Sequence, residues 1–437
     1  MSDKSIADKR WEKLRFILNR PSNFGNETGS LPNGYYEPGT GSILASPEPK
    51  ILVVGAGGLG CEILKDLALL GVKSIFVIDL DTIDLTNLNR QFLFRMKDVG
   101  RSKAQVAAEF IMNRVSGCVV QYFVGKIQEK DADFYRQFRV VISGLDNIEA
   151  RRWLNSMLVN LVEYDEEGNI DPSTIIPLID GGTEGFKGQA RVVVPRVTSC
   201  FECSLETFPP QRVFPMCTIA ETPRLPEHCI AYVSQLEWPR MHSRPLDPDS
   251  PSDMQWVFKR ALERAERHGI EGVTYFKTLG VVKNIIPAVA STNAVISAVC
   301  VAEALKLLTY CGQTLDSYLM FMGAQGMYSP SFRYGQKDSC PVCAEQAVPR
   351  ELVMSGASPL SALLLLLARD PALQLARPSL LAESTTLYMQ RPPQLELALR
   401  KNLTRPLQEL LESGELLTVT DPALGEQALT LRLLLTP

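Results

Sequence analysis

The sequence predicts an α/β fold with a mostly parallel sheet, and two observations carry this prediction. An apolar run at residues 51–54 leads directly into the glycine-rich segment Gly55-Ala-Gly-Gly-Leu-Gly60, after which apolar positions recur at helical spacing up to Gly71. A second apolar run, at residues 74–78, ends at Asp79, and strand and helix patterns then alternate to about Gly144. Such alternation is typical of a Rossmann-like domain, in which helices connect parallel strands.

The glycine-rich segment has the spacing of a nucleotide-binding loop. Gly55, Gly57 and Gly60 allow a tight turn, a close approach to a phosphate and close packing of the following helix, and Gly58 lies in the same loop. The amides at the start of that helix favour an anion, and Asp79, about 20 residues further on, suits ribose hydroxyls. Alone, the motif predicts a bound nucleotide, with a purely structural turn as the alternative.

Composition and charge narrow the class of protein. With 437 residues, of which 45% are hydrophobic and 22% charged, the chain is long enough for several globular domains. A net charge of -4 gives no reason to expect nucleic acid or a membrane surface as a partner. The apolar residues 285–302 include Pro287, Asn293 and Ser297, so we expect a buried helix there rather than a membrane span. No secretory signal is evident, and ten cysteines then indicate a reducing compartment, the cytoplasm or the nucleus.

Changes in composition along the chain predict five parts. A proline-rich stretch followed by a charged helical pattern interrupts the α/β region, and a leucine-rich α+β module follows it, with helices expected at 360–368 and 404–412 and strands at 386–389, 416–419 and 429–435. The expected parts are an N-terminal arm (1–47), a first part of the α/β domain (48–205), a mostly helical insertion (206–284), a second part of the α/β domain (285–345) and the C-terminal module (346–437).

Positive charge is predicted beside the glycine-rich loop. Arg90 and Lys103 follow the second strand, together with the amide side chains of Asn87 and Gln91 and the carboxylate of Asp81. Hydride transfer by an NAD-dependent oxidoreductase needs no such cations, whereas attack on a phosphate does, because cations offset the repulsion between an anionic nucleophile and the phosphate. We therefore expect Arg90 and Lys103 at a phosphate, with exposed basic side chains on a solvated face as the alternative.

A carboxylate is predicted at the same edge of the sheet. Asp146 follows the apolar run at residues 140–143, so it lies on the carboxyl edge of the sheet together with Asp79. A carboxylate at this position suits Mg²⁺ that bridges phosphate oxygens. The alternative is that Asp146 caps a helix at residues 147–158, and both roles are compatible.

Four of the ten cysteines form two pairs with metal-ligand spacing, Cys200 with Cys203 and Cys340 with Cys343. Four thiolates suit a closed tetrahedral Zn²⁺ site, which would join segments far apart in the chain. Free thiols are the alternative.

Cys217 differs from the other cysteines because it lies in a proline-rich segment, Phe214-Pro-Met-Cys-Thr-Ile219. Such a segment can present a reactive thiol on a loop or at a helix start. With only His228, His242 and His268 in the chain, a Ser-His-Asp hydrolase is hard to assemble and no histidine partner is evident for this thiol. The residues alone leave a nucleophile and an ordinary loop thiol equally open.

Taken together, these motifs resemble those of the ubiquitin-like modifier activating enzymes over nearly all of residues 1–345. The motifs that carry the resemblance are Gly55-Ala-Gly-Gly-Leu-Gly60, Asp79-Leu-Asp81, Asn87-Leu-Asn-Arg-Gln91, Gly100-Arg-Ser-Lys103, Gly144-Leu-Asp146, Gly181-Gly-Thr-Glu-Gly-Phe-Lys-Gly188, Pro215-Met-Cys-Thr-Ile219 and the two Cys-x-x-Cys pairs.

The resemblance implies an ATP-dependent reaction in two steps. ATP would be held by the glycine loop, Asp79 and Asp81, with its phosphates contacted from the positions of Asn87, Arg90, Gln91 and Lys103 and Mg²⁺ held by Asp146. The modifier's C-terminal glycine would become an acyl-adenylate and then a thioester on Cys217 before transfer to a conjugating enzyme.

The resemblance also implies partners. A related regulatory subunit would complete the adenylation unit as a heterodimer, and Arg191 would read the modifier's tail and help to exclude ubiquitin. The C-terminal module would be a ubiquitin-fold (β-grasp) domain that recruits the conjugating enzyme, with the N-terminal arm as a second docking element. Two alternatives remain at this point: an NAD-dependent oxidoreductase and a non-catalytic scaffold subunit of an activating enzyme.

Overall fold

The computed structural model describes most of the chain and divides it into two compact units. The described residues are 10–14, 49–208, 223–248, 250–282, 288–309, 311–312, 314–315, 317–344, 349–382, 385–389, 392–424 and 428–436. One unit comprises residues 1–209 and 288–437, and the other comprises residues 210–287. The sequence predicts five parts, a finer division than these two units, and that division stays a prediction.

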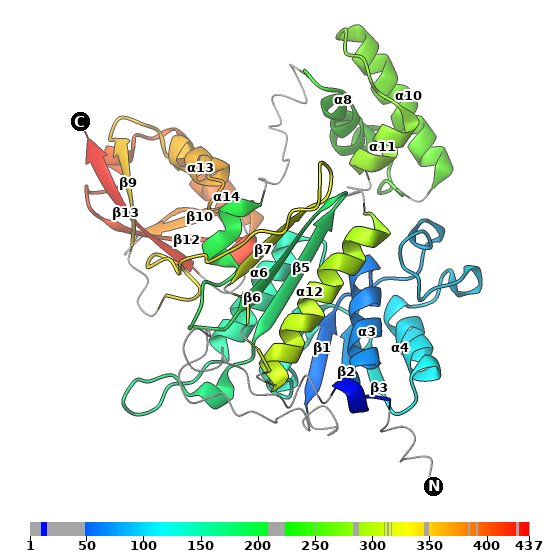
Figure 1. Ribbon diagram of the computed structural model, residues 1–437. Coiled ribbons are helices and arrows are strands. Elements are labelled where there is room, and N and C mark those ends of the chain that lie inside the picture. The colour runs from blue at the N-terminus through cyan, green and yellow to red at the C-terminus, as the bar shows by residue number, and fades with distance from the viewer. Residues whose placement is uncertain are drawn as a thin grey trace. The chain divides into compact units, whose positions relative to one another are not determined.

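The larger unit is built on an eight-stranded sheet with the strand order β3-β2-β1-β4-β5-β6-β7-β8 (Figure 1). Neighbouring strands from β3 to β5 pair in parallel, whereas β6, β7 and β8 are added as antiparallel strands. The mostly parallel sheet predicted from the sequence is therefore confirmed. The strands are β1 (Lys50–Val54), β2 (Ser74–Ile78), β3 (Val119–Phe123), β4 (Val140–Ser143), β5 (Leu178–Glu184), β6 (Lys187–Val193), β7 (Tyr318–Met322) and β8 (Ser331–Phe332).

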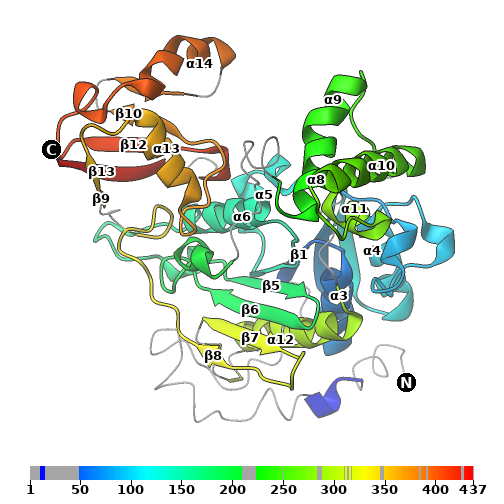
Figure 2. The same cartoon turned by 90° about the horizontal axis from the view of Figure 1, so that it is seen from above.

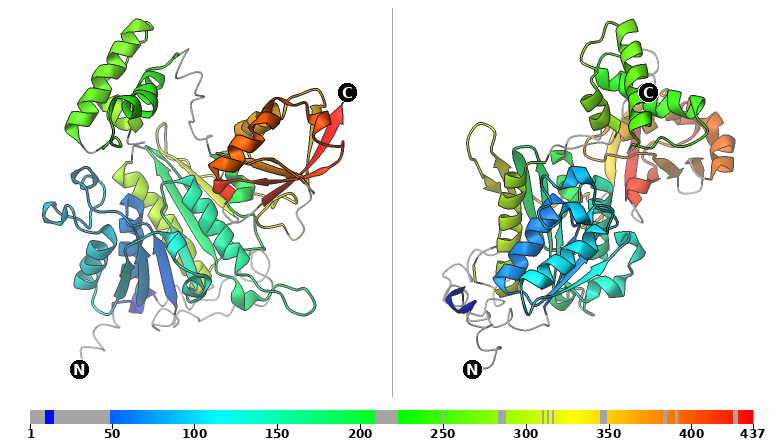
Figure 3. Two further views of the ribbon diagram at one scale, coloured as in Figure 1. Left: turned by 180° about the vertical axis from the view of Figure 1, so that it is seen from behind. Right: turned by 90° about the vertical axis from the view of Figure 1, so that its right-hand side faces the viewer.

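Helices cover both faces of this sheet because the side chains of each buried strand alternate between the two faces. Ile51 and Val53 of β1 pack in one core with helices α3 (Gly58–Leu70), α4 (Lys103–Arg114) and α12 (Ala290–Thr309). Leu52 and Val54 face the other core, with α5 (Ala132–Arg136) and α6 (Ile148–Asn160). The left view of Figure 3 shows the molecule from behind, with this face of the sheet towards the viewer.

Helix α12 overlaps the apolar residues 285–302, for which the sequence predicts a buried helix, and continues to Thr309. By length and composition alone it is apolar enough to cross a membrane. In the structure it packs against α3, β5 and β6, and Ile296, Cys300 and Ala304 are fully buried. The prediction of a buried core helix is confirmed.

The described N-terminal residues 10–14 are anchored on this unit through Trp11. The indole Nε1 of Trp11 donates to the Leu69 carbonyl at 2.7 Å, near the C-terminal end of α3. Arg10 and Lys73 each lie 4.4 Å from the ring centroid. The rest of the predicted arm lies outside the described residues.

The smaller unit is helical in its described part, as the sequence predicts for the insertion. Its core contains Cys229, Trp238, Val257 and Ala261. The helices are α8 (Pro226–Tyr232), α9 (Trp238–Met241), α10 (Pro251–Arg267) and α11 (Tyr275–Val282), with a π-helical segment at Val233–Glu237 between the first two.

The C-terminal module contains a separate five-stranded sheet, ordered β11-β10-β12-β13-β9 (Figure 2). Strands β9 and β13 pair in parallel, and the other neighbouring pairs are antiparallel. Helix α13 (Leu360–Arg369) buries Leu360, Leu363 and Leu367 against one face of the sheet. The strands are β9 (Arg350–Ser355), β10 (Ser379–Ala382), β11 (Thr386–Tyr388), β12 (Leu416–Thr420) and β13 (Ala428–Thr436).

One helix predicted in this module is wrong. In place of an α-helix at residues 404–412, the chain forms two 3-10 segments, Arg400–Thr404 and Leu407–Glu409, after helix α14 (Pro393–Leu399). Pro406 lies between the two segments and lacks the N–H that a continuous helix needs there.

Candidate active site

The glycine-rich loop closes tightly between β1 and α3. Gly55 has φ +96°, a left-handed conformation that side chains disfavour, and a Cβ on Gly60 would overlap the Gly55 carbonyl. Helix α3 begins at Gly58, with Gly57 as its N-cap. Gly57 offers no side chain to cap this helix, and the first turn has no acidic residue, so the amides and the positive end of the dipole suit an anion.

Asp79 fixes the loop to the end of β2. One carboxylate oxygen, Oδ2, accepts from the Ala56 amide at 2.6 Å, and Oδ1 accepts from the Asp81 amide at 2.8 Å. Burial raises the pKa of Asp79 above its usual range, while these two hydrogen bonds act in the opposite direction. The structure thus gives Asp79 a role in shaping the loop, in addition to the ribose contact expected from the sequence.

Lys103 and Asp81 form an ion pair next to the loop. The ammonium Nζ lies 2.7 Å from Asp81 Oδ2, and the Lys103 amide donates to the Asp81 carbonyl at 3.0 Å. Lys103 is buried in the first turn of α4, whose N-cap Ser102 accepts from the Gln105 amide. The alternative of an exposed lysine on a solvated face is therefore wrong.

Arg90, Asn87 and Gln91 come from the segment that follows β2. The Asn87 side chain closes a turn by accepting from the Asp84 amide at 3.0 Å. The Arg90 guanidinium donates to the carbonyl of Thr86, also at 3.0 Å. Gln91 is only 3% exposed, lies beside Gly57, and its Oε1 has no hydrogen-bond partner among the described residues.

Asp146 is exposed at the carboxyl end of β4, as predicted. The cap of the following helix is Asn147, whose side chain accepts from the Ala150 amide at 2.7 Å, so the alternative role of Asp146 as that cap is wrong. The hydrogen bond that the structure gives Asp146 is a long one from Asn147 Nδ2, at 3.4 Å. Its carboxylate is accessible to a cation at this edge of the sheet.

A buried network that the sequence did not reveal supports this edge. Arg151 Nη1 lies 2.7 Å from Asp180 Oδ2, and Arg151 also donates to the carbonyls of Leu145 and Gly181. These contacts join α6 to the middle of β5 and fix the residue before Asp146. An arginine in a helical pattern carries no sequence signal for such a role.

Arg191, the predicted modifier-reading residue, is 2% exposed. Its guanidinium lies 3.6 Å from Asp180, donates to Gln189 and Ser204, and lies between the rings of Phe201, Phe208 and Tyr318. These contacts hold the buried guanidinium in place, and the role of Arg191 in modifier choice stays a prediction.

The two cysteine pairs meet in the structure, although they lie 140 positions apart in the sequence. Sγ distances are 3.9 Å for Cys200 to Cys203, 3.6 Å for Cys200 to Cys340 and 3.4 Å for Cys203 to Cys343, and all four residues are buried. Four thiolates bound to one Zn²⁺ at about 2.3 Å would lie roughly 3.8 Å apart in a tetrahedron. The three distances are close to that spacing, and all four Sγ atoms lie within 4.8 Å of one another. The other predicted thiol, Cys217, lies outside the described residues.

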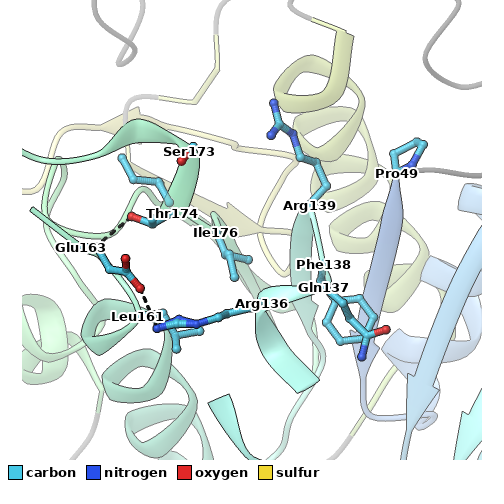
Figure 4. Close-up of a pocket in the computed structure, with 11 residues that line it drawn as sticks. Pro49, Arg136, Gln137, Phe138, Arg139, Leu161, Glu163, Ser173, Thr174 and Ile176 are labelled. Atoms are coloured by element: carbon cyan, nitrogen blue, oxygen red, sulfur yellow. Dashed lines mark hydrogen bonds and ion pairs between the residues drawn. The ribbon is translucent and has the colours of Figure 1, made fainter. Parts of the chain in front are cut away.

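A separate cavity of about 390 Å³ lies at the amino ends of β1 and β4. Figure 4 shows the residues that line it. Its lining includes Pro49 and Arg139, which precede β1 and β4, and the exposed ion pair between Arg136 and Glu163. Because Asp79 and Asp146 follow the carboxyl ends of their strands, this cavity is separate from the candidate active site.

The fold and the site define a nucleotide-binding α/β protein with a phosphate cradle at the carboxyl edge of its sheet. The model of the ThiF family matches residues 37–342, and that of the E2 binding domain matches residues 354–435. A crystal structure of E. coli MccB with ATP aligns at TM-score 0.44 and 19% identity, over 70% of this chain and 69% of that chain.

Three curated relatives are named NEDD8-activating enzyme E1 catalytic subunit. The Dictyostelium discoideum protein is 48% identical over 97% of this chain and 96% of its own length. Those of Drosophila melanogaster and Caenorhabditis elegans are each 46% identical, over 98% of this chain and 95% and 98% of their own lengths. The chain belongs to the ThiF family, within the group of NEDD8-activating enzyme E1 catalytic subunits. The predicted class of ATP-dependent ubiquitin-like modifier activating enzyme is confirmed, and the oxidoreductase alternative is set aside.

Proposed function

We propose that this chain uses ATP to activate NEDD8 and passes it to a conjugating enzyme. Three features at the carboxyl ends of the strands carry the proposal. They are the start of α3, the Lys103–Asp81 ion pair and the accessible Asp146 carboxylate. Relatives of nearly equal length with this name, and the match to an E2 binding domain, support the same function. A non-catalytic scaffold would not need these groups together.

In this proposal the glycine loop binds the phosphates of ATP through the amides of α3, with Arg90, Lys103, Asn87 and Gln91 around them. Asp79 and Asp81 hold the loop and the lysine and contact the ribose side of the nucleotide. Asp146 holds Mg²⁺, which neutralises charge on the phosphates. Each of these groups lies on or beside a carboxyl end of β1, β2 or β4.

Two covalent steps follow. A carboxylate oxygen of the modifier's last glycine attacks the α-phosphorus; the bond between that phosphorus and the bridging oxygen breaks, and pyrophosphate leaves with the electron pair. The Cys217 thiol then loses its proton and attacks the acyl carbon, and AMP leaves as a thioester forms. The conjugating enzyme's thiolate accepts the acyl group from Cys217.

The cysteine cluster is proposed as a structural Zn²⁺ site. Four buried sulfurs at tetrahedral spacing leave no open position for water, which is the arrangement of structural rather than catalytic zinc. The Lys337 amide donates to Cys203 Sγ at 3.4 Å, a contact that favours a thiolate. The ion would join the end of the first part of the adenylation domain (48–205) to the end of its second part (285–345).

Further parts of the proposal concern partners and place. A related regulatory subunit completes the enzyme as a heterodimer, as the term catalytic subunit in the relatives' names suggests. Arg191 contributes to modifier choice, the N-terminal arm is a second docking element for the conjugating enzyme, and the enzyme works in the cytoplasm or nucleus.

The test is thioester formation by the full chain, with and without the regulatory subunit, offered ATP, Mg²⁺ and a panel of ubiquitin-like modifiers. We expect an ATP-dependent adduct with NEDD8 that is cleaved by a thiol reductant and absent in Cys217→Ala. Preferential loading of another modifier, or an adduct that persists in Cys217→Ala, would overturn the corresponding part of the proposal.

A further inference from the structure

Asn293 faces the glycine-rich loop from a distant part of the chain. It lies in the first turn of α12 and is 1% exposed. A Cβ on Gly58, the first residue of α3, would overlap Asn293 Nδ2. Since α3 and α12 pack along each other, this amide lies where the starts of two helices meet.

The orientation of this side chain is fixed from the opposite side. Asn293 Oδ1 accepts from the Thr183 hydroxyl at 2.6 Å, and the neighbouring Thr292 hydroxyl donates to the Gly185 carbonyl at 2.8 Å. These two hydrogen bonds hold the first turn of α12 on the end of β5. With Oδ1 occupied, the Nδ2 group points towards Gly58.

Asn293 Nδ2 has no hydrogen-bond acceptor in the described part of the chain. A buried N–H group without an acceptor is unfavourable, and most such groups in folded proteins have a partner. Gln91, buried beside the preceding residue Gly57, differs in that its unpaired atom among the described residues is the acceptor Oε1. The first turn of α3 carries no acidic side chain that could serve as the acceptor.

We propose that Asn293 donates a hydrogen bond from Nδ2 to an anionic oxygen of the reacting pair. That oxygen belongs either to a phosphate of ATP or to the carboxylate of the modifier's last glycine, because the two anions must meet at the start of α3. The inference rests on the proposed function. It makes Asn293 a substrate-contacting residue contributed by the segment that follows the insertion.

The test compares Asn293→Ala and Asn293→Asp with Ser297→Ala in the full chain assembled with its regulatory subunit. Ser297 is a matched control: it lies one turn further along α12, is fully buried, and donates to Asp66 of α3 at 3.0 Å. Ser297→Ala removes a hydrogen bond between α12 and α3 at a point away from the glycine-rich loop. The measurements are the Kd of Mg-ATP without modifier, the KM for NEDD8 and kcat in ATP–pyrophosphate exchange, and thermal unfolding.

We expect Asn293→Ala to lose about 10- to 100-fold in at least one of these kinetic or binding constants, as for the loss of one hydrogen bond to a charged group. Asn293→Asp, nearly the same in shape, should lose more, because it places a carboxylate against an anion, and it carries the test if the alanine variant fails to fold. A weaker Mg-ATP complex assigns the phosphate, and a raised KM for NEDD8 alone assigns the carboxylate.

Asn293 variants whose constants match those of Ser297→Ala would overturn this inference and leave the proposed function intact. Wild-type protein without NEDD8-dependent exchange would instead contradict the proposed function itself.

Discussion

Lys103 Nζ and Asp81 Oδ2 lie 2.7 Å apart, so the lysine predicted to meet a phosphate is already held by a carboxylate. Asp81 accepts from Lys103 through both its side chain and its backbone carbonyl. The pair places a cation beside the glycine loop before ATP arrives, which reduces the reorganisation that binding requires.

Replacing Lys103 by Met should lower kcat/KM for NEDD8-dependent pyrophosphate exchange by about 10²–10³-fold, the range for removal of one preorganised charge-stabilising group. Asp81→Asn should lose less, because the ammonium remains. The double variant should lose little more than Lys103→Met, since the two residues act as a unit. Losses that simply multiply would show that Asp81 does not act through Lys103.

Removal of zinc should destabilise the larger unit. We expect metal analysis of the purified chain to find one Zn²⁺, and Cys343→Ser or prolonged chelation to lower the unfolding temperature. Cys311→Ser is the control, because this partly exposed cysteine lies outside the cluster. A metal-free chain that unfolds at the same temperature as the untreated protein would refute the zinc site.

The buried ion pair between Arg152 and Glu202 should be important for stability. The side chains are 3% and 5% exposed, and two hydrogen bonds join them. Arg152→Met leaves an uncompensated buried carboxylate and should lower the free energy of unfolding by about 3–5 kcal/mol. For comparison, Arg405→Met breaks an exposed pair with Glu409 and should cost less than about 1 kcal/mol. Denaturant unfolding that gives equal losses would contradict this assignment.

The raised pKa of Asp79 gives a pH effect with a definite sign. Burial makes the folded-state pKa higher than the unfolded-state value, so the folded state binds this proton more readily. The ionised carboxyl therefore destabilises the fold at neutral pH, and that cost is relieved as pH falls through the folded-state pKa towards about 4. In thermal unfolding, wild-type protein should gain stability relative to Asp79→Asn as pH is lowered through this window. A constant difference would contradict the raised pKa.

Local patterns predicted most of the fold. Apolar runs ending at a glycine or an aspartate located β1, β2 and β4, and the carboxyl edge that these strands share brings Gly55, Asp79 and Asp146 to one side of the sheet. The failure at residues 404–412 has a local cause, since leucine spacing favoured a helix while Pro406 interrupts it. The two Cys-x-x-Cys pairs were predicted to meet, because each pair supplies two ligands and a structural Zn²⁺ needs four.

Long-range contacts account for what the sequence could not predict. In the sequence, Asn293 is only one of the residues that interrupt the apolar stretch 285–302. Its direction towards Gly58 depends on how α12 packs on α3. Asp180 joins Arg151 and Arg191 through side chains from three different elements, which no periodicity reveals. The same packing buries Arg191, although a residue that reads a modifier's tail would be expected at an accessible position.

The most direct test of the account is ATP–pyrophosphate exchange by Cys217→Ala assembled with the regulatory subunit. If the glycine loop and its surrounding charges form an adenylation site upstream of the thiol, this variant should exchange pyrophosphate in the presence of NEDD8 at a rate near that of wild-type protein, while forming no thioester. Asp146→Ala should lose both activities. Exchange that does not depend on NEDD8, or that continues unchanged in Asp146→Ala, would contradict the central claim.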